Sequence, residues 1–140
     1  MTGPIDWRDA VRVARAAEVN AAVAGPEGGR ATAFEFAGTD GARTWIGRVA
    51  LAPGARTGAH RHGLHEAVLF IIAGRGRILW GERLDYAAEV APGDFVYFAP
   101  QVPHEEINLD GMAPLEFVVV RSDGERIFQP LDIVSENSVT

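Results

Sequence analysis

Cysteine and lysine are both absent from this sequence of 140 residues. Without cysteine there is no disulfide, no thiolate nucleophile and no thiolate metal ligand. Without lysine there is neither a Schiff-base amine nor a lysine general base, and all 13 basic residues are arginine. Any catalysis by this chain would therefore depend on histidine, carboxylates, tyrosine or a metal ion held by histidine and carboxylate.

An excess of positive charge and a long apolar run are missing as well. The formal net charge of −6 argues against binding to nucleic acid, which usually requires a basic face. No apolar run approaches the roughly 20 residues that span a bilayer, and the first residues lack the order of a signal peptide. The sequence also contains no P-loop, no GxGxxG and no GxSxG. We expect a cytoplasmic protein that acts on a small molecule, without a nucleic-acid or membrane partner.

One segment near the N-terminus is predicted to be helical. With 47% apolar and 23% charged residues, the chain has the composition of one globular domain. Asp6 can cap a helix over residues 6–24, where Trp7, Val11 and Ala14 lie near helical spacing. Gly25-Pro26 would end it. We interpret this helix as an arm that packs against the rest of the chain or against a partner subunit.

The remainder of the sequence has a pattern typical of β-structure, with short apolar runs separated by turn residues such as Pro53-Gly54 and Pro92-Gly93-Asp94. This spacing is typical of an all-β sandwich or barrel. The run from Val68 to Ile72 is apolar on both faces, which predicts a strand buried on both sides. The predicted strands are residues 31–36, 44–51, 67–73, 76–80, 95–98, 104–108 and 115–121.

The chain has only 4 histidines, and three of them fall within six residues. In an extended chain His60 and His62 point to the same face, so both imidazoles can reach one metal ion about 2.1 Å away. Glu66 shares that parity if no bulge intervenes, and His104 on another strand would complete a three-nitrogen, one-oxygen site. Such ligands suit Fe(II), Mn, Ni, Co, Zn or Cu. The alternative is that the HxH pair is an ordinary surface pair.

Taken together, these residues resemble the cupin family. The first family motif is matched by Gly54, His60-Arg61-His62, Glu66 and Gly74, and the second by Gly93-Asp94, His104 and Asn108. The resemblance covers residues 54–108 and implies an all-β jelly-roll barrel over residues 31–128. A short N-terminal helix or arm (residues 1–30) and a C-terminal tail (129–140) would flank it. It also implies that His60, His62, Glu66 and His104 bind the metal.

The sequence departs from the family pattern next to the fourth ligand. Seven residues separate Glu66 from Gly74, where the family usually has six. Either a one-residue bulge follows Glu66, or the ligand slot lies at Ala67 and the site has three histidines only. His65 has the opposite parity to His62, and we expect it outside the ligand set unless it replaces Glu66.

A metal in a small barrel would be a single divalent transition ion, with Fe(II) the first choice. The reaction expected first is an oxygenase of dioxygenase type; the alternatives are a Lewis-acid isomerase or cyclase, or a binding protein without catalysis. Glu106 shares the inward parity of His104 and is our candidate catalytic residue, as a general base or to orient a ligand histidine. The alternative is that Glu106 simply lies at the solvated mouth of the barrel without a functional role. Exposed edge strands and the apolar arm predict a homodimer.

Overall fold

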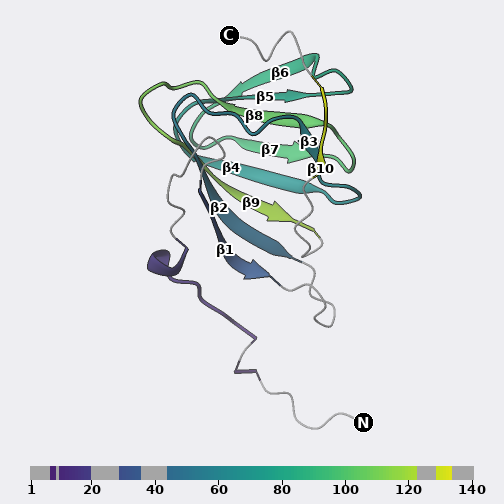
Figure 1. Cartoon of the computed structure of the whole chain (residues 1–140). Helices are drawn as coiled ribbons and strands as arrows, with labels where there is room; N and C mark the ends of the chain where they lie inside the picture. The colour runs from purple at the N-terminus through teal and green to yellow at the C-terminus, as the bar shows by residue number, and fades with distance from the viewer. Residues whose placement is uncertain (1–6, 9, 20–28, 36–43, 123–128, 134–140) are drawn as a thin grey trace.

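The structure is a computed structural model that describes residues 7–8, 10–19, 29–35, 44–122 and 129–133 (Figure 1). The described chain is almost entirely β-structure, with one short 3₁₀ turn, η1 (Ala16–Glu18), near its beginning. The ten strands are β1 (Gly29–Glu35), β2 (Trp45–Leu51), β3 (His60–Arg61), β4 (Ala67–Ala73), β5 (Gly76–Trp80), β6 (Tyr86–Val90), β7 (Phe95–Phe98), β8 (His104–Asn108), β9 (Leu115–Arg121) and β10 (Gln129–Pro130).

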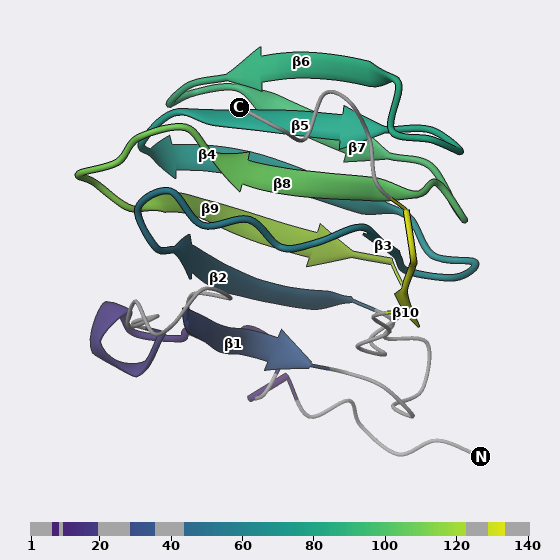
Figure 2. The ribbon, with the colours of Figure 1, turned by 45° about the horizontal axis from the view of Figure 1, so that its top comes forward.

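These strands form two antiparallel sheets of five strands each. One sheet has the order β1-β2-β9-β4-β7 and the other the order β10-β3-β8-β5-β6. Figure 2 shows the two sheets as stacked layers, with β8 and β5 facing β9 and β4. The apolar core lies between them and includes Trp45, Leu51, Leu69, Ile71 and Phe117. The predicted all-β jelly-roll architecture is therefore confirmed.

The predicted helix over residues 6–24 is wrong for the residues that the structure describes. No α-helix is present in residues 7–8 and 10–19, and η1 is the one helical turn there. Trp7 and Val11 are 70% and 80% exposed, so these two members of the apolar stripe bury no surface that would hold a helix in place. Because a short helix is marginal without such packing, propensity alone does not maintain it. Asp6 and residues 20–24 lie outside the described residues.

Strand β4 has the predicted bounds but not the predicted burial. Leu69 and Ile71 face the core, whereas Val68, Phe70 and Ile72 are each more than a third exposed on the opposite face. No described element covers this part of the sheet, which is why the prediction of burial on both sides fails. The strand with both faces covered is instead β8, where all five residues are buried.

Both faces of β8 are covered because the C-terminal segment folds back onto the sheet. Strand β10 pairs with β3, and the Leu131 N–H donates a hydrogen bond of 2.9 Å to the Ala59 carbonyl. Leu131 and Ile133 pack against a second apolar cluster that includes Ile107. Residues 129–133, which the sequence assigned to the tail, thus hold β3 against β8.

In the described chain no helix is long and apolar enough to cross a membrane.

Candidate metal centre

Three histidines meet on the inner side of the sheet that contains β3 and β8. His60 on β3 lies directly opposite His104 on β8, and His62 follows β3 by one residue. One ring nitrogen from each of the three lies within 4.8 Å of the others. His60 and His104 are 2% and 1% exposed. The structure therefore brings together the three predicted histidines from two separate motifs.

Backbone carbonyls fix the orientation of two of these rings. The His60 Nδ1 lies 2.8 Å from the Gly58 oxygen, and the His104 Nδ1 lies 3.0 Å from the Val102 oxygen. A carbonyl oxygen only accepts hydrogen bonds, so each Nδ1 carries a proton and each Nε2 is the ring nitrogen directed away from that carbonyl. The His104 Nε2 is buried without a hydrogen-bond partner in the described chain. Such an arrangement is typical of metal-ligating histidine, so these residues fit a transition-metal ion.

The environment of His104 keeps its imidazole neutral. Burial lowers the pKa of His104 below its usual value, because desolvation outweighs the attraction of Glu106. The Phe98 ring stacks on the imidazole with 4.0 Å between ring centroids. A neutral imidazole is the form that binds metal ions.

Glu106 lies next to two of these histidines. Its side chain is buried, and its two oxygens lie 3.6 Å from the Nε2 atoms of His60 and His104. The Thr57 hydroxyl donates a 2.9 Å hydrogen bond to the carboxylate, and the Glu106 N–H donates to the Thr57 Oγ1. Burial alone would raise the pKa of Glu106, but the imidazoles and the Thr57 hydroxyl outweigh it, so the pKa lies below its usual value. The carboxylate is thus held ionised beside the histidines.

Glu66 is not brought to the histidines, which corrects the predicted ligand set. Its side chain is exposed and accepts a hydrogen bond from the Tyr97 hydroxyl, a contact that raises the pKa of Tyr97. Ala67 takes the inward position and lines the cavity beside His60 and His62. Of the two alternatives left open by the spacing, the structure agrees with a ligand slot at Ala67. His65 is not part of the group of converging ring nitrogens.

A buried cation lies in the wall of the same small cavity. Arg121 on β9 is 1% exposed, and its guanidinium carbon lies 4.3 Å from the centroid of the Trp45 ring. The cavity has a volume of about 30 Å³ and is lined by Arg121 together with His60, His62 and Glu106. Arg121 is the last residue of the predicted strand 115–121, and no sequence pattern indicated its burial.

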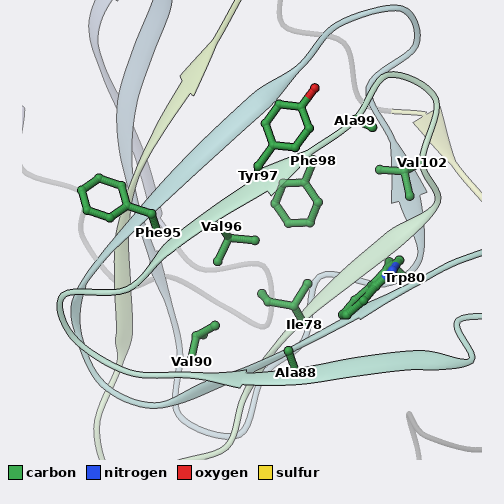
Figure 3. Close-up of a pocket in the computed structure, with 10 residues that line it drawn as sticks. All are labelled: Ile78, Trp80, Ala88, Val90, Phe95, Val96, Tyr97, Phe98, Ala99 and Val102. Carbon is green, nitrogen blue, oxygen red and sulfur yellow. The ribbon is translucent and has the colours of Figure 1, made fainter.

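A second cavity, of about 380 Å³, lies beside the centre and is apolar (Figure 3). Figure 3 shows Ile78, Val90, Val96 and Phe98 around one space between β5, β6 and β7. Phe98 lines this cavity and also stacks on His104, so one ring separates the apolar space from the histidines. Neither this role of Phe98 nor the contact of Thr57 with Glu106 had a signal in the sequence.

Comparisons with known proteins agree with this architecture. A "cupin 2 domain-containing protein" from Halorhodospira halophila is 25% identical, with 74% of this chain and 69% of that chain covered and a TM-score of 0.62. An oxalate oxidase is 16% identical, with coverages of 86% and 63% and a TM-score of 0.67. Oxalate decarboxylase from Bacillus subtilis is 26% identical over 64% of this chain and 24% of its own, with a TM-score of 0.56. The search of curated proteins finds no match.

The family model that describes the cupin domain matches residues 47–121. This range runs from β2 to the end of β9 and includes all three converging histidines. The match covers more than half of the chain, and the two stacked sheets agree with it. The chain belongs to the cupin family.

Proposed function

We propose that this chain is a metal-dependent cupin enzyme that performs oxygen chemistry of the dioxygenase type on a small organic acid. The observation that carries the proposal is the convergence of His60, His62 and His104, with the Nε2 atoms of His60 and His104 directed inward by backbone carbonyls. Three imidazoles whose ring nitrogens converge on one point form a ligand set that a divalent transition ion accepts.

The three histidines would hold the metal, and the metal would supply a redox centre for a reaction with dioxygen. Fe(II) is the first ion to test, since imidazole and carboxylate oxygen are ligands that it accepts. The protein's own contribution is to keep the His104 imidazole neutral and to exclude water. Burial of His104 and the stacked Phe98 ring support both functions.

The substrate we propose carries a carboxylate. Arg121 lines the cavity of the histidines, and its positive charge there favours a substrate that is an anion. Two of the structural neighbours are named for oxalate, a small dicarboxylate, which supports the same class. The adjacent apolar cavity would accept an apolar part of the molecule if the Phe98 ring turned aside.

Oxygen consumption by the Fe(II)-loaded chain tests this proposal. The chain is loaded anaerobically and then mixed with oxygen and a panel of oxalate, hydroxy acids, diketones and aromatic carboxylates. We expect consumption that depends on one member of the panel and that is lost in His62→Gln but kept in His65→Gln, because His65 lies outside the cluster. A chain that binds metal and consumes no oxygen with any of them would contradict the oxygenase proposal and favour Lewis-acid chemistry or ligand binding.

We also propose that two copies of the chain associate through the exposed part of the β4 and β7 sheet face. The outer apolar face consists of Val68, Phe70, Ile72, Phe95 and Tyr97. The Phe70 and Phe95 rings are in contact across the two strands, with centroids 4.7 Å apart. Contiguous exposed apolar side chains of this kind are typical of interaction sites.

A second copy is the occupant that the charge distribution favours. The chain carries a net charge of −6, so two copies repel over most of their surfaces. None of the five side chains of the outer apolar face is charged, and the Glu66 carboxylate at its edge is hydrogen-bonded to Tyr97, so the middle of the face brings no like charges together. A sheet face of this kind is also self-complementary under the two-fold symmetry of a dimer.

A further inference from the structure

Glu106 occupies a position in the metal centre that a carboxylate ligand normally fills from a different part of the chain. The first motif presents Ala67 at the inward position, and the neighbouring Glu66 is turned to the outer face, where it bonds Tyr97. The first motif therefore supplies no acidic side chain to the cavity. On β8, two residues after His104, Glu106 points into the same cavity from the opposite sheet.

The distances suit a shared metal better than a direct hydrogen bond. Each Glu106 oxygen lies 3.6 Å from an Nε2 atom, one from His60 and the other from His104. This is longer than a normal hydrogen bond, and both Nδ1 protons are already committed to carbonyls. Two ligand atoms about 2.1 Å from one metal are about 3.0 to 3.4 Å apart at octahedral or tetrahedral angles. The two oxygens are therefore near ligand spacing to His60 and His104, and the carboxylate has to move toward His62 for one ion to contact all four side chains.

Hydrogen bonds to Thr57 also hold the Glu106 carboxylate in place. Thr57 donates a hydrogen bond to Glu106 Oε2 and accepts one from the Glu106 N–H. The Thr57 N–H donates in turn to the Glu106 carbonyl at 3.0 Å. Such an outer partner orients a ligand carboxylate and leaves its other oxygen free to approach the ion.

We infer that Glu106 is the fourth protein ligand of the metal, so that the carboxylate of this centre comes from β8 and the second motif in place of the first. The inference rests on the proposed metal-dependent function and deepens it. It gives the centre three imidazoles and one carboxylate: His60 comes from β3, His62 from the turn after β3, and His104 and Glu106 from β8. A single carboxylate favours a divalent ion and leaves its remaining positions to substrate.

The test is the binding of Co(II) alone to the full chain and to Glu106→Gln, measured by calorimetric titration and by the absorption spectrum of the bound ion. We expect Glu106→Gln to bind Co(II) at least about tenfold more weakly, because the loss of an outer partner alone already has an effect of this size. At saturating Co(II) its spectrum should differ from that of the wild type, since the spectrum reports the atoms in contact with the ion. Glu66→Gln should match the wild type in both measurements.

Glu105→Gln is the matched control on the same strand. Glu105 is also buried, but it faces away and pairs with Arg56 at 2.8 Å. We expect this variant to lose stability while keeping the wild-type Co(II) spectrum. Circular dichroism of each metal-free variant checks folding, and Glu106→Asp provides a carboxylate at the same position if Glu106→Gln does not fold. In that case, an Asp variant with an unchanged Co(II) affinity and spectrum would overturn the inference.

Other outcomes separate the inference from the function on which it rests. If Glu106→Gln folds and has an unchanged spectrum at saturation, Glu106 is not a ligand, and the inference fails while the metal centre stands. In that case, a loss of turnover in Glu106→Gln would indicate that Glu106 acts as a general base. If the wild type binds no Co(II) and no Fe(II), both the inference and the proposed function are overturned.

Discussion

At the scale of single residues, two adjacent glutamates on β8 show how strand alternation separates two uses of buried charge. Glu105 pairs with Arg56 through two hydrogen bonds, of 2.8 and 3.0 Å, and raises the pKa of that guanidinium. Glu106 points to the opposite face and meets the histidines. The Glu105 carboxylate is paired with Arg56, whereas the Glu106 carboxylate lies beside His60 and His104 and has a pKa below its usual value.

Asn108 is a second buried polar residue of β8, and we predict that it holds the end of the barrel together. Its amide nitrogen lies within hydrogen-bond distance of the carbonyls of Leu51, Ala52 and Ala113, and its oxygen accepts from the Asp110 N–H. Asn108→Ala would leave buried carbonyls unsatisfied and lower the free energy of unfolding by about 2–4 kcal/mol. Urea denaturation measures the change, and a loss below about 0.5 kcal/mol would contradict this role.

The residues of the centre could be predicted from the sequence as far as alternation holds. His60 and His62 are two apart, and the second motif marks His104, so their convergence could be predicted. Glu66 could not be placed in this way, because residues 63–66 interrupt the strand and Gly63 has a φ of +66°. Counting parity from His62 across this turn therefore fails. Glu106 follows His104 within one regular strand, and there the predicted inward direction is correct.

At the scale of elements, strands rich in β-branched and aromatic residues were predictable with their bounds, as β4, β5, β7 and β9 show. Strands β3 and β10 have two residues each, and β6 has two alanines, so none carries a pattern long enough to detect. The error at β4 has a different origin. An apolar outer face is equally compatible with burial inside the chain and with burial against a partner.

The outer apolar face of β4 and β7 leads to a prediction about assembly. We expect the wild type to have the mass of a dimer in light scattering after size-exclusion chromatography. Phe70→Asp places a charge in the centre of the face and should shift the chain to the monomer with an unchanged circular dichroism spectrum. Met112→Asp is the control, because Met112 is 90% exposed in the turn after β8. A monomeric wild type would refute the proposed dimer.

At the scale of the whole molecule, the fold creates the centre by pairing distant segments. Strand β3 is only two residues long, and it is held between β8 and β10 so that His60 faces His104. The resemblance of both motifs to the cupin pattern was sufficient to predict the barrel, because turn residues and strand spacing determine this architecture. The small polar cavity, its Arg121 wall and the adjacent apolar cavity depend on side-chain packing, which no sequence pattern encodes.

A metal ion that binds only the folded chain stabilises it, so binding and stability are linked. The most direct measurement is an anaerobic titration of the wild type with Fe(II), followed by stoichiometry and thermal unfolding, beside His62→Gln and His65→Gln. We predict one ion per wild-type chain and a stabilisation of about 2.7 kcal/mol when free metal is about 100 times Kd. His62→Gln should lose most of this gain and His65→Gln should keep it. A wild type that binds no metal, or a His62→Gln variant that binds as tightly, would contradict the metal centre.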